Sequence, residues 1–416
     1  MLFAADIDTG ATAWVLVSTA LVAFMTPGLA FFYGGMLRSK NVLGMLMQNI
    51  FSMGLISVLW AAIGFSLAFG GNNAYIGNFD FLFLKDLGTI AELPGYTGDL
   101  GLAVPIMVFF AFQMMFAVIT PALITGATAD RLKFSAYAVL IGVWGVIVYP
   151  VVAHWVFSPN GWLFKRGALD FAGGAVIHVN AGVAALAVIL VLGNRKGWPR
   201  EAMPPHNLPF TVLGTGILWF GWFGFNAGSA LGANGLAAQA LVNTHLAAAA
   251  AMCGWLIVEK LRAGHATTLG AASGAVAGLV AITPCAGFVG GFAPVIIGLI
   301  AGVVCYLALS LKTKFGFDDS LDVIAVHLVG GILGAILLGF FADTKVNSLG
   351  FDGIFFGGGA ELLIDQLVAL GATIVFSFVV TWIIAKAINA TIGLRVSTED
   401  ELVGLDQSQH AESAYQ

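Results

Sequence analysis

The chain contains 416 residues, of which 59% are hydrophobic and 9% are charged, and its net charge is −5. A mean hydropathy of +0.95 excludes an ordinary soluble fold, because too few polar residues are available to cover a surface that faces water. The chain also lacks a basic tract of the kind that binds nucleic acid, so we expect no nucleic-acid partner.

Eleven apolar segments along the chain are candidates for membrane-spanning helices. In chain order they cover residues 11–32, 42–69, 102–124, 134–157, 173–192, 209–227, 237–258, 267–283, 292–311, 323–341 and 362–387. The eighth is the shortest. The sequence therefore predicts an all-α integral membrane protein, with a transmembrane domain over residues 1–390 and a polar tail over residues 391–416.

Lysine and arginine residues are unevenly distributed between the loops that these spans would create. With eleven spans, thirteen of the seventeen fall on one side of the membrane and four on the other. The positive-inside rule then places the N-terminus outside and the C-terminus in the cytoplasm. An even number of spans would mix the two groups, so the charges favour eleven spans, and we expect them in the cell (inner) membrane.

Aromatic residues gather in the third and sixth spans. Phe112 and Phe116 lie one helical turn apart and therefore on one face. The segment 221–229 places three aromatic rings before a hydroxyl, and Ser229 shares a face with Phe225. Aromatic faces attract a cation, and a hydroxyl accepts a hydrogen bond from one. The alternative interpretation is an ordinary belt of aromatic residues at the membrane interface.

Two segments repeat one spacing of aspartate and histidine, Asp170-x7-His178 in the fifth span and Asp319-x7-His327 in the tenth. Ionisable residues inside a membrane are costly and usually face a cavity or a transport path. Because spans five and ten each end a set of five, the repeat predicts two five-helix halves of opposite orientation, followed by one extra helix. Such an inverted repeat places both imidazoles near a shared site at the middle of the membrane.

The aspartates and the tail also have simpler interpretations. Asp170 could cap the N-terminus of the fifth span, and Asp319 and Asp322 could cap the tenth. The tail is either a disordered chain end or a segment that docks on the cytoplasmic face.

Histidines on facing helices could also bind haem, which would make the chain a redox enzyme. The many small residues of the spans, however, predict helices packed too closely for a macrocycle. No cysteine or glutamate accompanies the histidines, which argues against a metal site. We therefore expect no metal, no cofactor and no enzymatic activity.

Five motifs along the chain resemble signatures of the ammonium transporter (Amt/MEP) family. They are TPGLAFFYGG at residues 26–35, DFAGGAVIHVNAG at 170–182, GWFGFNAGS at 221–229, DVIAVH at 322–327 and GLRVSTEDELVGLD at 393–406. Because these motifs extend from the first span into the tail, the whole chain is identified as a member of that family.

The resemblance implies an outer recruitment site for ammonium. Its members would be three aromatic rings, one hydroxyl and a carboxylate that supports them electrostatically, namely Phe112, Phe116, Phe225, Ser229 and Asp170. Phe116 and Phe225 would also gate the pore.

Below this site the resemblance implies an apolar pore in which His178 and His327 are paired, with Trp222 and Tyr149 near the lumen. Ammonium would lose a proton before it enters, because a bare ion in a low dielectric costs on the order of tens of kcal/mol. Neutral ammonia would then pass, with or without separate movement of the proton. Potassium has no proton to lose and would be excluded.

The resemblance further implies a homotrimer in the lipid bilayer, with one pore per subunit, and regulation by a PII-type protein at the cytoplasmic face. Two relatives of the same fold give alternative functions: an ammonium sensor with little transport, and an Rh-type gas channel without the cation site. The aromatic rings and Ser229 argue against the second.

The chain departs from the family pattern at two positions. Phe157 lies where the family usually has tryptophan, and phenylalanine is the weaker cation–π partner. We therefore expect weaker cation binding, unless Trp155 turns inward and supplies the missing ring. Asp130 lies where the family usually has glutamate, which is a milder change.

Overall fold

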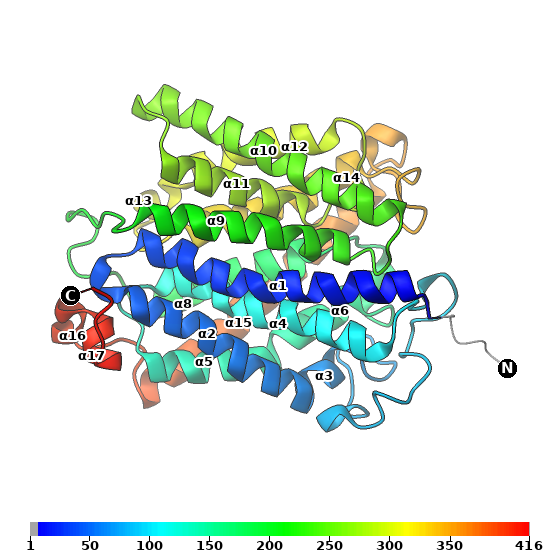
Figure 1. The fold of residues 1–416 in the computed structure, drawn as a ribbon, viewed down its shortest axis with the longest axis horizontal. Coiled ribbons are helices and arrows are strands. Elements are labelled where there is room, and N and C mark those ends of the chain that lie inside the picture. The colour runs from blue at the N-terminus through cyan, green and yellow to red at the C-terminus, as the bar shows by residue number, and fades with distance from the viewer. Residues whose placement is uncertain (1–6, 416) are drawn as a thin grey trace.

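The structure is a computed structural model and describes residues 7–415. Within these residues every regular element is helical, and the one isolated β-bridge joins Leu132 to Arg395. The long helices run along the long axis of the molecule, and the start of α1 (Thr9–Met36) and the C-terminal tail lie at opposite ends (Figure 1). The predicted all-α class is therefore confirmed.

The first half of the chain supplies the helices of the first five predicted spans. Besides α1 they are α2 (Val42–Leu59), α3 (Phe65–Phe69), α4 (Ile106–Thr128), α5 (Phe134–Ile147), α6 (Tyr149–Phe157), α7 (Trp162–Arg166) and α8 (Asn180–Leu192). A π-helical segment, Trp60–Gly64, joins α2 to α3, and a second, Gly174–Val179, leads into α8.

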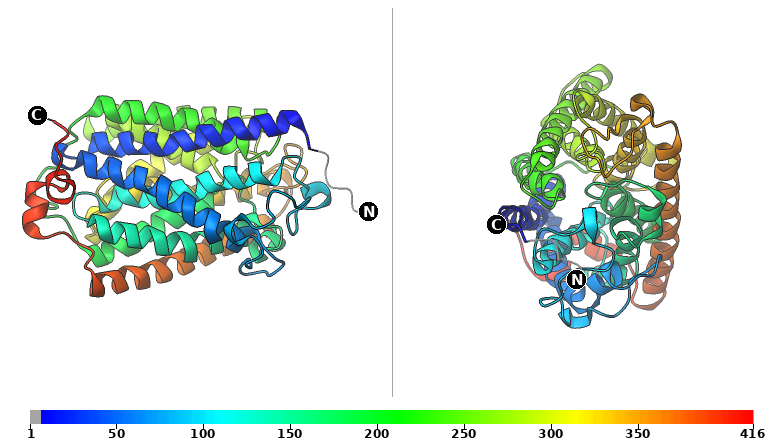
Figure 2. Two further views of the ribbon diagram at one scale, coloured as in Figure 1. Left: turned by 60° about the horizontal axis from the view of Figure 1, so that its bottom comes forward. Right: turned by 90° about the vertical axis from the view of Figure 1, so that its right-hand side faces the viewer.

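The second half of the chain supplies the helices of the remaining predicted spans. Its helices are α9 (Leu208–Trp222), α10 (Gly235–Ala263), α11 (Thr268–Ile282), α12 (Ala293–Ala308), α13 (Ser310–Phe315), α14 (Gly330–Phe341) and α15 (Glu361–Thr391). A π-helical segment, Phe223–Ala227, extends α9, and another, Ile324–Val329, leads into α14. Figure 2 shows α15 along the outside of the bundle, where it packs against α8.

Ten of the described helical stretches are long and apolar enough to cross a membrane. The helix of the eighth predicted span, α11, has 15 residues. At about 1.5 Å per residue it covers about 22 Å, less than the hydrocarbon core of about 30 Å. The structure thus supports a multi-pass membrane protein with about ten spans, and the eleventh span stays a prediction.

Proline explains two differences from the predicted spans. The third span was expected from residue 102 but begins at Ile106, directly after Pro105. The fourth is divided between α5 and α6, because Pro150 has no N–H to donate to the carbonyl four residues before it.

Glycine permits close approach between helices in the bundle. A Cβ atom on Gly298 or Gly302 of α12 would clash with the carbonyl oxygen of Ala247 or Ala251 in α10. Helices in lipid rely on such packing, since burial of apolar surface gives little driving force there. The close packing expected from the small residues is therefore present.

The tail folds into two short helices, α16 (Thr398–Val403) and α17 (Leu405–His410). Helix α17 packs against α2 and against α16. The Asp406 carboxylate accepts hydrogen bonds from the backbone N–H groups of Leu43 (3.0 Å) and Gly44 (2.8 Å). Burial raises the pKa of Asp406, while the two N–H donors act in the opposite direction. This part of the tail docks on the bundle and is not a trailing chain end.

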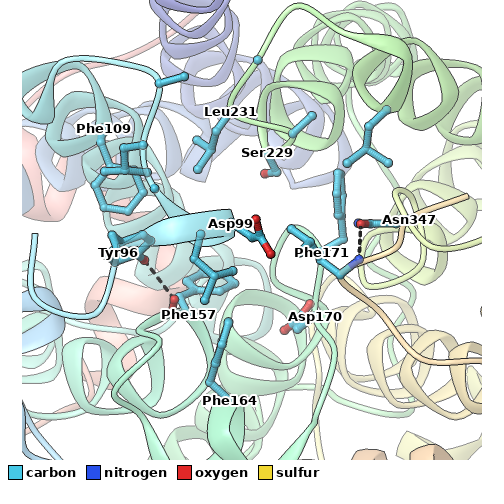
Figure 3. A pocket seen from close by; sticks show the side chains of 18 of the residues that line it. Tyr96, Asp99, Phe109, Phe157, Phe164, Asp170, Phe171, Ser229, Leu231 and Asn347 are labelled. Carbon is cyan, nitrogen blue, oxygen red and sulfur yellow. Dashed lines mark hydrogen bonds between the residues drawn. The ribbon is translucent and has the colours of Figure 1, made fainter. Parts of the chain in front are cut away.

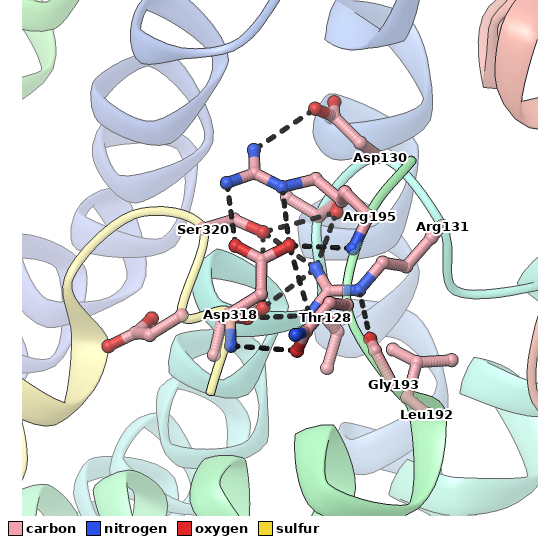
Figure 4. Close-up of polar contacts among 12 residues, drawn as sticks. Thr128, Asp130, Arg131, Leu192, Gly193, Arg195, Asp318 and Ser320 are labelled. Atoms are coloured by element: carbon pink, nitrogen blue, oxygen red, sulfur yellow. Dashed lines mark hydrogen bonds and ion pairs between the residues drawn. The ribbon is translucent and has the colours of Figure 1, made fainter. Parts of the chain in front are cut away.

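Beside the tail, buried ion pairs join the loops between the helices (Figure 4). Arg195 contacts both carboxylate oxygens of Asp318, at 2.9 and 2.8 Å, and also Asp130, at 3.2 Å. Burial alone would raise the pKa of Asp318, but hydrogen bonds from Arg195 and the charge of Arg131 lower it. Asp130, shorter than the glutamate expected from the family, still reaches Arg38 at 3.0 Å. The network therefore ties both halves of the chain together at this end.

Candidate functional site

A cavity of about 1030 Å³, called the outer cavity below, opens at the end of the bundle where α1 begins (Figure 3). Among its lining residues are Phe112, Phe116, Phe157, Asp170 and Ser229, so the structure brings five of the predicted site residues together. Within residues 7–415, no lysine, arginine or histidine lines this cavity. Its walls therefore combine aromatic faces with acidic charge, which suits a cation.

Aromatic rings close the floor of the cavity. The ring centroids of Phe112 and Phe116 are 4.8 Å apart, and those of Phe116 and Phe225 are 4.4 Å apart. All three rings are buried. Ser229 donates a hydrogen bond to the carbonyl of Phe225 at 2.8 Å, which leaves the lone pairs of its oxygen available to another donor. These rings separate the open cavity from the interior of the bundle.

Asp170 lines the same cavity and caps the π-helical segment Gly174–Val179. One carboxylate oxygen accepts from the N–H groups of Gly173 (2.9 Å) and Gly174 (2.6 Å), and the other accepts from Ala175 (2.9 Å) and Val176 (3.2 Å). Burial raises the pKa of Asp170 to about 6, and the backbone donors act against this rise. The capping interpretation is confirmed, and it leaves the carboxylate at the cavity wall.

Beneath the aromatic floor lie the two histidines. The Nδ1 atoms of His178 and His327 are 3.2 Å apart, and the rings are nearly parallel, with an interplanar angle of 21°. A hydrogen bond between two Nδ1 atoms requires one of them to carry a proton and the other to accept it. Both side chains are buried, and His178 Nε2 has no partner among the described residues.

The surroundings of the pair are apolar and narrow. A small cavity of about 10 Å³, called the inner cavity below, is lined by both histidines together with aliphatic and aromatic side chains: Met25, Leu29, Ile119, Leu123, Ile177, Leu218, Trp222, Phe225 and Val276. The Trp222 ring lies 5.3 Å from that of His178 and nearly parallel to it, and its Nε1 donates to Thr283 at 2.9 Å. Trp222 is thus placed at the pair, as the resemblance implies.

The tenth span repeats the geometry of the fifth. Asp319 accepts from the N–H groups of Val323 (3.1 Å) and Ile324 (2.7 Å), the fourth and fifth residues after it, as Asp170 does with Gly174 and Ala175. The alternative that Asp322 also caps this span is wrong. Its backbone has a positive φ of 63°, and its carboxylate pairs instead with Lys312 at 2.6 Å.

Two predicted aromatic positions differ from expectation. Tyr149 lines neither the outer nor the inner cavity of the described chain, because it follows the break between α5 and α6 and packs against Trp60 and Trp144. Trp155 does not turn inward: its Nε1 donates to the carbonyl of Tyr75 at 2.7 Å, and its ring packs against Phe376. Phe157 is therefore the ring that this part of α6 offers to the cavity.

The structure adds two residues that the sequence interpretation did not assign. Gln113 lines the outer cavity with a buried side-chain oxygen that has no partner within residues 7–415. The Tyr33 hydroxyl lies 3.5 Å from His327 Nε2. In both cases the sequence shows a polar residue within an apolar span. Gln113 lies in the aromatic segment 112–116, and Tyr33 lies in the family motif at 26–35.

Comparison with known proteins agrees with this geometry. Residues 13–415 match the Ammonium Transporter Family. The chain is 50% identical to an ammonium transporter of Mycobacterium tuberculosis, over 98% of this chain and 90% of the relative. Its fold matches the crystal structure of Candida albicans Mep2 with a TM-score of 0.88 and 34% identity, over 95% of this chain and 88% of that one. It also matches a structure described as a sensor Amt protein, with a TM-score of 0.87 and 29% identity, over 96% of this chain and 98% of that one.

An all-α membrane bundle with an acidic, aromatic outer cavity above two buried imidazoles defines a transport protein. The chain belongs to the ammonium transporter family, which is a family of transporters and channels and not of enzymes.

Proposed function

We propose that the chain recruits ammonium in the outer cavity and conducts ammonia past His178 and His327. The proton that ammonium loses either returns to the outer solution or crosses the membrane separately. The observation that supports this most is the order of the three parts: a cation-attracting cavity, a floor of stacked rings, and an imidazole pair in apolar surroundings. A charged ion would lose most of its hydration at the rings, which costs on the order of tens of kcal/mol. Ammonia avoids that cost, and potassium cannot.

The membrane arrangement is part of the same proposal. We infer eleven spans with α11 as the eighth, an inverted five-helix repeat plus α15, the N-terminus outside and the tail in the cytoplasm of a bacterial-type cell membrane. The transmembrane domain would cover residues 1–390 and the tail 391–416. The unequal distribution of lysine and arginine supports this orientation.

The assembly is also proposed from family membership: a homotrimer, with a PII-type regulator at the tail end. The mass of the detergent-solubilised protein by light scattering tests the trimer. Binding of a purified PII-type protein to reconstituted vesicles tests the regulator.

Reconstituted liposomes provide the test of function. A jump in ammonium concentration should produce either a current on a solid-supported membrane or, if no net charge moves, a rise in internal pH reported by a trapped dye. A potassium jump should produce neither response. Absence of both ammonium responses would reject the transport proposal.

A sensor role is the second candidate, because the fold also matches the sensor Amt protein. The same measurement separates the two functions. Ammonium binding by calorimetry without transport would favour the sensor.

Phe157 gives a prediction about affinity. Its ring lines the outer cavity, and the Tyr96 hydroxyl donates to its carbonyl at 2.9 Å, which fixes the backbone there. A cation–π contact is worth ~0.5–2 kcal/mol and is strongest for tryptophan. Phe157→Trp should therefore lower the half-saturating ammonium concentration by a factor of roughly two to five, since ~1.4 kcal/mol is tenfold.

The matched control for this prediction is Phe157→Leu, which keeps the bulk and removes the aromatic face. Its half-saturating concentration should rise. Identical values in Phe157→Trp, Phe157→Leu and the unmodified protein would show that this ring does not contribute to cation recruitment.

The docked tail gives a further prediction. Deletion after Ile392 removes the Asp406 contacts to α2 and the bridge between Leu132 and Arg395. A hydrogen bond to a charged group such as Asp406 is worth ~1.5–3 kcal/mol, so these contacts stabilise the docked tail. We therefore expect transport to fall by roughly half or more when they are removed. Asp406→Ala should lower transport in the same direction, whereas Glu399→Ala, an exposed change in the same tail, should not. Normal transport and normal response to a PII-type protein after the deletion would contradict a role for docking.

A further inference from the structure

Three carboxylates line the outer cavity: Asp8, Asp99 and Asp170. Two of them already bind backbone groups. Asp8 caps α1 by accepting from the N–H of Ala11, and Asp170 accepts from four N–H groups. The Asp99 side chain is exposed and makes no hydrogen bond or ion pair with any other residue between 7 and 415. Of the three carboxylates, Asp99 is therefore the one whose charge is not offset by any contact in the described chain.

The loop that carries Asp99 is held at both sides of the cavity. On one side, the Tyr96 hydroxyl donates to the carbonyl of Phe157 at 2.9 Å. On the other, the backbone N–H of Asp8 donates to the carbonyl of Ala103 at 2.9 Å. The short helical turn Gly98–Leu100 between these two attachments carries Asp99, and Figure 3 shows its carboxylate directed into the cavity.

A negative charge in this position acts on a cation before the cation reaches the rings. Charge of one sign in a cleft with apolar walls concentrates counter-ions there, and the effect decreases as salt increases. No cationic side chain of the described chain lines the cavity and opposes it. The smaller ring of Phe157 lies in the same cavity, so an added electrostatic attraction would offset its weaker cation–π contact.

We propose that Asp99 is a recruitment residue of the outer cavity, which raises the local ammonium concentration and offsets the weaker aromatic face of Phe157. The inference rests on the proposed function, because it adds a residue to that site. It assigns Asp99 to the attraction of the cation and not to the deprotonation or conduction steps.

The test is Asp99→Asn in the full-length protein, with ammonium-jump responses titrated at low and high ionic strength. At low ionic strength the half-saturating ammonium concentration should rise about three- to tenfold, which corresponds to ~0.7–1.4 kcal/mol. At high ionic strength the difference should largely disappear, and the maximal response should be unchanged. Asp99→Glu should retain most of the low-salt affinity.

Asp86→Asn is the matched control, since Asp86 is another exposed aspartate between α3 and α4 and lines neither described cavity. It should leave the titration unchanged. The unmodified protein gives a second measurement that does not depend on a variant: its half-saturating concentration should rise with ionic strength.

Unchanged affinity and unchanged salt dependence in Asp99→Asn, with normal transport by the unmodified protein, would overturn this inference alone. A salt-independent affinity of the unmodified protein would overturn it too. Absence of transport by the unmodified protein would overturn the proposed function instead.

Discussion

Replacement of His178 or His327 with alanine is expected to lower selective ammonium transport roughly 5- to 150-fold while the protein stays folded. Apart from Trp222 Nε1, which is bound to Thr283, the two imidazoles supply the side-chain polar groups among the residues that line the inner cavity. Each variant also leaves the remaining Nδ1 without its 3.2 Å partner. An unsatisfied buried polar group costs ~1–3 kcal/mol, which corresponds to a roughly 5- to 150-fold lower rate if the cost falls on the barrier.

The measurement compares ammonium and potassium jumps in liposomes that contain equal amounts of protein. His245→Ala is the matched control: His245 is also a histidine of a predicted span, but it is exposed on α10 and its ring packs against Trp219. The control should transport normally. Full transport with potassium still excluded in both pore variants would refute the assigned role of the pair.

Asp170→Asn is expected to reduce transport more than tenfold and to lower the thermal stability of the protein. Each oxygen of Asp170 accepts two backbone N–H groups. In asparagine one oxygen becomes an NH₂ group, which is a donor, so two buried N–H groups face a donor and lose their acceptor. Each loss costs ~1–3 kcal/mol, and the cavity also loses a negative charge beside the rings.

Asp319→Asn separates the loss of the cap from the loss of charge in the cavity. Asp319 caps the corresponding segment of the tenth span but does not line the outer cavity in the described chain. It should lower the melting temperature in detergent but leave the half-saturating ammonium concentration close to that of the unmodified protein. Equal loss of ammonium affinity in the two variants would show that Asp170 acts only as a structural cap.

Apolar segments in the sequence were enough to predict ten helices that are long and apolar enough to cross a membrane, since a bilayer requires long apolar stretches whatever their partners. The repeated Asp-x7-His spacing was enough to indicate that His178 and His327 belong together. The sequence did not predict the direction in which individual aromatic rings point. Tyr149 lies at the break beside Pro150, and Trp155 follows it in α6. A break of this kind changes the direction of the side chains after it in a way that the periodicity of one continuous helix does not describe.

The π-helical segments were also not predicted, because one extra residue in a turn leaves the composition of a span unchanged. The role of Gln113 required the surrounding cavity as well. Only the structure shows that its side-chain oxygen is buried without a partner in the described chain.

The matched segments Gly174–Val179 and Ile324–Val329 have a consequence for sorting relatives of this chain. Because every residue of a helix rotates the chain about the helix axis, the loss of one residue between aspartate and histidine would rotate one of them away from its present partner. A relative could then keep the cap or keep the imidazole in place, but not both. The number of residues between the two side chains is thus a stricter criterion than their identity: sequences that retain both residues at another separation should be grouped apart from those that conserve the paired imidazoles.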